Sequence, residues 1–136
     1  MDFVKFSLSG FDEFLIYAGL AVVFIYAYMI TYLWLTPYKE LQLIKDGNVA
    51  AAVSLSGAVL GFTFPLAAAI QHSVHPWDMM LWAVIAGLVQ LIVYLAVRYT
   101  LINVTRRIPD GQVASGVVLA SISVSAGILN AACMTY

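Results

Sequence analysis

The side chains with the clearest potential for chemistry lie between the second and third apolar runs of the sequence. His72 and His75 precede Asp78 there, and imidazole with carboxylate is a ligand set that zinc accepts. His75 also precedes Pro76, and the residue before a proline disfavours helical backbone, so the two rings do not share one helical face. We therefore interpret His72 and His75 as loop residues, with zinc binding as the alternative, and predict no metal site.

Two amide side chains lie inside apolar runs. Gln90 falls just past the middle of the third run, and Asn130 lies at the depth of Pro65. An intramembrane amide either lines a path for water or ions, or forms an interhelical hydrogen bond that contributes roughly 0.6 kcal/mol. Intramembrane polar groups mark function mainly when they ionise, which Gln90 cannot do. The hydrogen bond is therefore the favoured interpretation.

Pro65 interrupts the hydrogen-bond ladder of the second run. It lacks the N–H that would bond the carbonyl of Gly61, and its ring pushes against that carbonyl. The broken helices of transporters use such free carbonyls to bind ions. More often a nearby hydroxyl covers the group, and Thr63 is available. We therefore expect a kink at Pro65 that is structural, with the free carbonyl covered by a hydroxyl group rather than used to bind an ion.

Enzymatic chemistry is not indicated. The serines of the last run share it with no histidine or acid, and neither a phosphate-binding glycine loop nor a dinucleotide fingerprint occurs. Cys133 is the single cysteine, so it forms neither an intrachain disulfide nor a cysteine metal site. The net charge of −1 argues against nucleic-acid binding. The prediction is a non-enzyme without a cofactor.

Membrane helices must position these groups. Of the 136 residues, 63% are hydrophobic and 10% are charged, against roughly half and a quarter in soluble domains. The apolar residues form runs at 14–36, 47–70, 79–97 and 111–133 that hold no charged side chain. Each is near the length of about twenty residues that crosses a bilayer, where backbone must be helical. We predict an all-α integral membrane protein, one domain over 1–136, whose third helix extends past Arg98 through Val104.

Basic residues predict the orientation of the helices. Five of them lie in the connections that follow the first and third apolar runs: Lys39, Lys45, Arg98, Arg106 and Arg107. Only Lys5 lies on the opposite side of the membrane. Since short basic loops stay in the cytoplasm, both termini are predicted to be periplasmic.

The chain also repeats itself. The segment 46–50, DGNVA, returns 64 positions later as DGQVA at 110–114. We therefore predict two tandem two-helix repeats, about 12–70 and 77–134, in the same orientation. Asp46 and Asp110 are expected to cap the helices that follow, since a carboxylate accepts bonds from unpaired N–H groups there.

Small residues recur at helical spacing in the second and fourth runs. In lipid, close approach of small residues is the main route to helix association. The second and fourth helices are therefore predicted to form the centre, and the first and third to meet lipid or neighbouring subunits. The predicted packing residues are Gly57, Gly61 and Pro65 on the second helix and Ser121, Ser125 and Gly127 on the fourth.

Three stretches carry a resemblance to a known family: KDGNVAAAVSLSGAVLGFTFPLAAAI, the glutamine of LVQLIVY, and the ending GILNAACMT. They resemble the YjfL-like inner-membrane proteins, a bacterial family of unknown function. The resemblance implies a location in the bacterial cytoplasmic membrane and no enzyme activity. Family genes often accompany envelope-stress genes, which implies envelope-stress proteins as partners.

Two functional hypotheses follow. The first is a homo-oligomeric structural or interaction component of the inner membrane, in contact with its lipids. The alternative is an oligomeric channel or transporter for ions or small solutes. The alternative requires an assembly, because four short helices leave little room for a pore inside one subunit. A continuous polar face would favour the second hypothesis.

Overall fold

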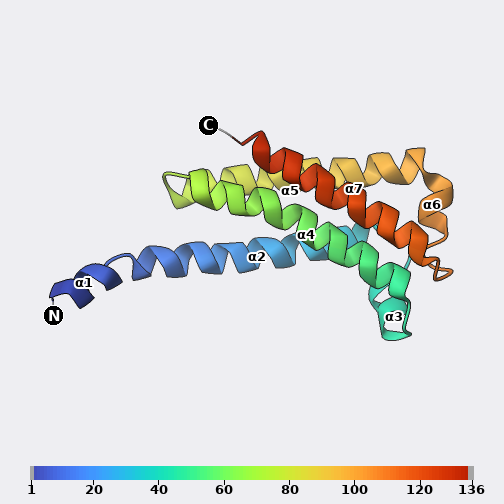
Figure 1. The fold of residues 1–136 in the computed structure, drawn as a ribbon, viewed down its shortest axis with the longest axis horizontal. Coiled ribbons are helices and arrows are strands. Elements are labelled where there is room, and N and C mark those ends of the chain that lie inside the picture. Colours follow the sequence, from blue (N-terminus) through green and yellow to red (C-terminus); the bar gives the residue numbers. More distant parts are fainter. Residues whose placement is uncertain (1, 135–136) are drawn as a thin grey trace.

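The computed structural model describes residues 2–134 of the chain, and every regular element in this range is an α-helix (Figure 1). The long helices are α2 (Phe11–Leu35), α4 (Val49–His72), α5 (Pro76–Thr100) and α7 (Val113–Ala132). The short helices are α1 (Asp2–Leu8), α3 (Glu40–Lys45) and α6 (Ile102–Arg106).

Four helices are long and apolar enough to cross a membrane, with α1 and α2 together counted as one. This confirms the predicted all-α membrane fold and places each helix within a few residues of an apolar run. One boundary was wrong. The third helix does not extend through Val104, because α5 ends at Thr100 and the chain turns at Leu101 before α6.

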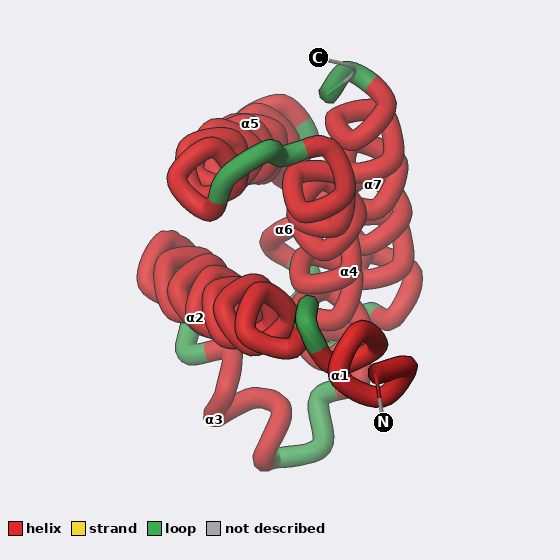
Figure 2. Tube along the Cα trace, turned by 90° about the vertical axis from the view of Figure 1, so that its left-hand side faces the viewer, coloured by secondary structure: helices red, strands yellow, loops and turns green. Residues whose placement is uncertain are grey.

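The long helices alternate in direction, so the two connections that contain α3 and α6 lie at the same end (Figure 1). We call this the basic end, since it carries Lys39, Lys45, Arg98, Arg106 and Arg107. Seen end-on, α4 and α7 form one layer and α2 and α5 the other (Figure 2). The element order of long helix, short helix and long helix occurs twice, while the duplication itself stays a prediction.

The starts of α4 and α7 differ from the prediction. Asp46 and Asp110 are exposed and cap neither helix, because Gly47 and Gly111 follow them with φ angles of +88° and +81°. These left-handed turns, which glycine adopts without steric cost, delay each helix start.

Asn48 is the side chain that caps α4. Its Oδ1 accepts a hydrogen bond from the Ala51 N–H at 3.0 Å. Its Nδ2 also donates to the carbonyls of Ile108 (3.0 Å) and Pro109 (3.2 Å). The same residue therefore starts a helix and ties the two connections at the basic end together.

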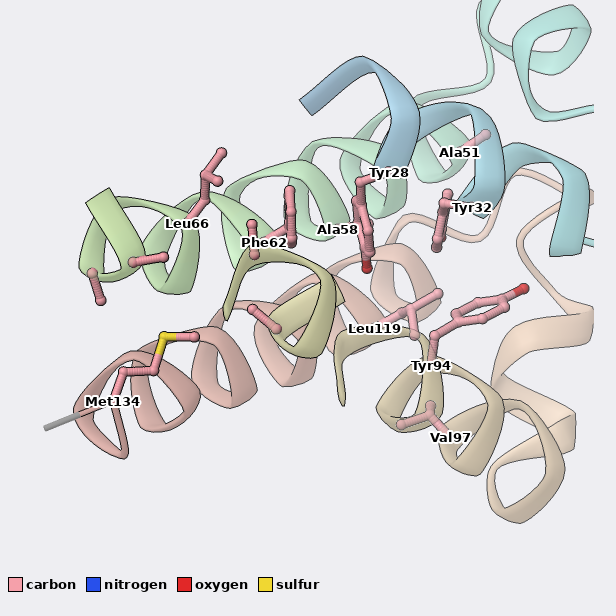
Figure 3. Packing of buried hydrophobic residues seen from close by; sticks show 14 of the residues in the cluster. Tyr28, Tyr32, Ala51, Ala58, Phe62, Leu66, Tyr94, Val97, Leu119 and Met134 are labelled. Atoms are coloured by element: carbon pink, nitrogen blue, oxygen red, sulfur yellow. The ribbon is translucent and has the colours of Figure 1, made fainter. Parts of the chain in front are cut away.

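Aromatic side chains of α2 contact both α4 and α5 (Figure 3). Tyr28 of α2 stacks on Phe62 of α4, with ring centroids 4.5 Å apart. Tyr32 meets Tyr94 of α5 edge to face at 4.9 Å. The bulky helix α2 therefore does more than face lipid, because its buried tyrosines fill the space between α4 and α5.

The helices α4 and α7 touch backbone to backbone. Four glycines lie where an added Cβ atom would overlap the opposite helix: Gly57 at Ala120, Gly61 at Ser123, Gly116 at Ala50 and Gly127 at Gly61. Ser121 and Ser125, the predicted partner surface, are exposed. Ser121 follows the contacting Ala120, and successive residues turn by about 100° around a helix of 3.6 residues per turn. Ser125 lies about one turn further along the same side as Ser121. Both serines therefore lie beside the contact.

The proline in α4 lies one turn after Gly61, which takes part in this contact. Pro65 is buried and leaves the Gly61 carbonyl without its helical N–H. The Thr63 hydroxyl, expected to cover that carbonyl, instead donates to the carbonyl of Val59 at 2.8 Å. The Gly61 carbonyl faces the backbone of Gly127, which has no side chain to block it.

Alanine at Gly61 or Gly127 is expected to destabilise the protein, although one methyl group is a small change. Both new Cβ atoms would overlap opposing backbone, and overpacking of this kind costs about 1–3 kcal/mol. Thermal unfolding in detergent should show a lower midpoint for Gly61→Ala and Gly127→Ala.

Gly19→Ala is the matched control, since Gly19 lies within α2 and no atom is within 4 Å of its added Cβ. It should unfold like the wild type or slightly later, because alanine favours helix over glycine by about 1 kcal/mol. Equal midpoints for all three variants would contradict the backbone contact.

Candidate functional site

Both intramembrane amides join α5 to α7. Gln90 is 2% exposed, and its Nε2 donates to the carbonyl of Ser123 at 3.1 Å. Asn130 donates to the carbonyl of Ala86 at 3.3 Å. The Oε1 of Gln90 is buried without a hydrogen-bond partner among residues 2–134. This geometry makes Gln90 a link between helices.

The histidine loop lies at the end of the bundle away from the basic end. The Nδ1 of His75 accepts a hydrogen bond from the Trp77 N–H at 3.2 Å and so caps α5, which begins at Pro76. His72 is exposed at the end of α4. Within the described part of the chain, no group of three or more His, Cys, Asp or Glu side chains is placed to hold a metal ion.

An open groove of about 580 Å³ runs between α4 and α7. It opens on the side of these helices that α2 and α5 leave uncovered (Figure 2). Its lining is formed by Ala52, Val53, Ser56, Gly57, Leu60, Ala120, Ser121, Val124 and Ser125. We call it the serine groove, because Ser56, Ser121 and Ser125 are exposed in it. The two serines predicted to pack inside the bundle therefore lie on an external surface.

A buried carboxyl group lies at the basic end. Glu40, the first residue of α3, is 2% exposed, and neither carboxyl oxygen has a hydrogen-bond partner in the described structure. Loss of contact with water raises the pKa of this carboxyl from 4.5 to about 8.

The burial of Glu40 was not predicted from the sequence, although the spacing of its apolar neighbours indicates it. Leu43 and Ile44 follow it by three and four residues and are partly buried against the core. Residues at these spacings share one face of a helix. A glutamate on the apolar face of a short helix indicates a carboxyl group that turns inward.

A second pocket, of about 350 Å³, lies at the same end and is lined by Pro37, Tyr38, Arg98, Tyr99, Ile102, Thr105, Arg106 and Pro109. We call it the arginine pocket. The Arg98 guanidinium donates to the carbonyl of Leu35 at 3.1 Å and lies 5.7 Å from the centre of the Tyr99 ring. These contacts fix the Arg98 side chain, which links α5 to the C-terminal end of α2.

The stability of the protein should depend on pH through Glu40. The folded state keeps the proton up to about pH 8, whereas an unfolded chain releases it near 4.5. Stability should therefore fall as pH rises between these values and stay low above them. Thermal unfolding of the wild type in detergent should show a lower midpoint at pH 9 than at pH 6.

Glu40→Gln removes the titrating group and keeps the shape. The variant should lose most of the difference between pH 6 and pH 9 and exceed the wild type in stability at pH 9. An unchanged pH dependence in Glu40→Gln would show that another group causes it.

Known proteins share this sequence over nearly its whole length. A family model described as Domain of Unknown Function (DUF350) matches residues 6–134. The UPF0719 inner membrane proteins YjfL of Escherichia coli strain K12 and of Escherichia coli O157:H7 are each 35% identical over 130 residues, which covers 96% of both chains. No solved structure matches the chain significantly. The predicted resemblance is thereby confirmed: the chain is a multi-pass membrane protein that belongs to the YjfL-like family, described as Domain of Unknown Function (DUF350).

Proposed function

We propose that the chain is a homo-oligomeric structural or interaction component of the bacterial inner membrane, and that its copies meet through the serine groove. The observation that supports this proposal most strongly is that three serine side chains lie exposed on the apolar, membrane-spanning part of the surface. The proposal assigns no enzymatic reaction. Contact with envelope-stress proteins is an additional expectation that rests on the family resemblance alone.

The composition of the groove favours a protein partner over lipid. Hydrocarbon offers no hydrogen bond to a hydroxyl group, whereas a second protein surface does. Small side chains at the groove allow a second backbone to come close, which is the main source of helix association in membranes. The exposed faces of α2 and α5 carry large apolar residues such as Leu88 and Ile92, whereas the groove combines serines and small residues with Val53, Leu60 and Val124.

A second copy of this chain is the partner that the groove suits. Both walls of the groove contribute serines and small residues, so the surface can pair with itself about a two-fold axis. Serine hydroxyls then meet across the contact, where each interhelical hydrogen bond contributes roughly 0.6 kcal/mol.

The channel hypothesis has less support. Gln90, the large amide side chain inside α5, is buried and bonded to the backbone of α7. A group that lines a pore would face a water-filled surface. An oligomeric pore would have to use exposed hydroxyl groups of the long helices, among them the serines of the groove and Thr31 of α2.

The proposed orientation places the basic end in the cytoplasm. Both basic connections lie at this end, and the histidine connection between α4 and α5 carries no lysine or arginine. The positive-inside preference then puts both termini in the periplasm.

Cysteine cross-linking tests the proposed contact. In a Cys133→Ser background, Ser56→Cys and Ser121→Cys should each give disulfide-linked dimers when membranes are treated with a lipid-soluble oxidant. Val22→Cys and Ile92→Cys are the controls, since both residues are exposed on the opposite layer. Cross-linking of the controls alone would place the interface on α2 and α5 and refute the proposal.

A reporter that fluoresces only in the cytoplasm tests the orientation. Fused after Tyr136, it should stay dark, whereas insertion at Gly47 in the first basic connection should give fluorescence. A bright fusion at Tyr136 would reverse the proposed topology.

A further inference from the structure

The arginine pocket combines two positive charges with hydroxyl groups. Arg98 and Arg106 line it together with Tyr38, Tyr99 and Thr105. No aspartate or glutamate is among its lining residues. Its volume of about 350 Å³ lies within the range of roughly 300–1,000 Å³ that is usual for small-molecule sites.

The charges in the pocket are not neutralised by the protein. Neither arginine forms an ion pair with a carboxylate in the part of the chain that the structure describes. Asp110 directly follows the lining residue Pro109, but neither Asp110 nor Glu40 lines the pocket. An anion that enters the pocket would therefore meet two arginines and no carboxylate in the lining.

Arg98 is held in place and still has donors to offer. A guanidinium group carries five N–H donors, and among residues 2–134 the contact with the Leu35 carbonyl is the single hydrogen bond that Arg98 makes. The remaining donors form a planar fork that matches two oxygen atoms of a phosphate or carboxylate. Because the contact with Leu35 already fixes Arg98, an anion would lose little free energy in ordering that side chain.

The position of the pocket distinguishes between these anions. Arg98 directly follows the apolar run 79–97, so the pocket lies where the membrane-spanning part of α5 ends. This is the level of the phosphate groups of the bilayer, and basic pockets between helices at that level bind lipid headgroups. Pro37, Ile102 and Pro109 add an apolar wall beside the arginines, which suits the glycerol portion of a lipid.

We propose that the pocket formed by Arg98, Arg106, Tyr38 and Thr105 binds a phosphate group, carried by an anionic phospholipid headgroup or by free phosphate. Arg98 provides the fixed contact between α2 and α5. The exposed Arg106, on α6 in the connection between α5 and α7, contacts the phosphate group from the other side. A bound phosphate would thereby join the two connections of the basic end.

The chain offers a matched pair of variants as a test. Arg106 and Arg107 are neighbours, both exposed, but only Arg106 lines the pocket. Arg106→Gln and Arg107→Gln remove the same charge from almost the same place. Loss of one charge-assisted contact should weaken phosphate binding about tenfold in Arg106→Gln and leave Arg107→Gln close to the wild type.

Native mass spectrometry of the delipidated full-length protein in a maltoside detergent gives the measurement. The probes are phosphatidylglycerol, inorganic phosphate, and diacylglycerol, which has the same acyl chains without phosphate. Adducts with phosphatidylglycerol that inorganic phosphate does not displace indicate a headgroup site, and displacement indicates that free phosphate binds too. Both results support the proposal, provided that Arg106→Gln loses the adducts.

Three results would overturn the proposal. The first is equal loss of phosphatidylglycerol adducts in both variants, which would indicate general surface charge. The second is equal binding of diacylglycerol and phosphatidylglycerol, and the third is no binding of either phosphate probe. Size-exclusion profiles of the variants show that each is folded before binding is compared.

Discussion

The contact between the backbones of α4 and α7 is the constraint on which the rest of the structure depends. Lipid is as apolar as a leucine side chain, so helices in a membrane gain little from hiding apolar surface and must gain from close packing. Gly61 and Gly127 permit that packing, because an added side-chain atom at either would overlap backbone of the other helix. The same closeness brings the Ser123 carbonyl within reach of Gln90, which adds α5 to the pair.

Other features follow from this contact. With α4 and α7 tightly joined, α2 and α5 cover one side of them, and the tyrosines of α2 fill the space between the layers. The opposite side remains as the serine groove. At the basic end, the connections that lead into α4 and α7 must converge, and Asn48 joins them by bonding to the carbonyls of Ile108 and Pro109. The same convergence buries Glu40 and encloses the arginine pocket.

The sequence predicted the membrane class and the helices well, since length and the lack of charge are properties of each segment by itself. It also identified the small-residue faces. It failed where position depends on contact between segments. Asp46 resembles a cap, but the left-handed Gly47 shifts the helix start. The orientation of Ser121 depends on the rotation of α7, which close packing against α4 sets. Glu40 is buried where α3 packs against α4, which composition alone does not reveal.

Solid-state NMR of the carbon-labelled protein in liposomes tests the central contact most directly. We expect a short-range cross-peak between the carbonyl carbon of Gly61 and the α-carbon of Gly127. It should persist when labelled protein is diluted with unlabelled protein, because both glycines belong to one chain. Absence of the cross-peak, or its loss on dilution, would contradict an intramolecular contact between α4 and α7 as the basis of the fold.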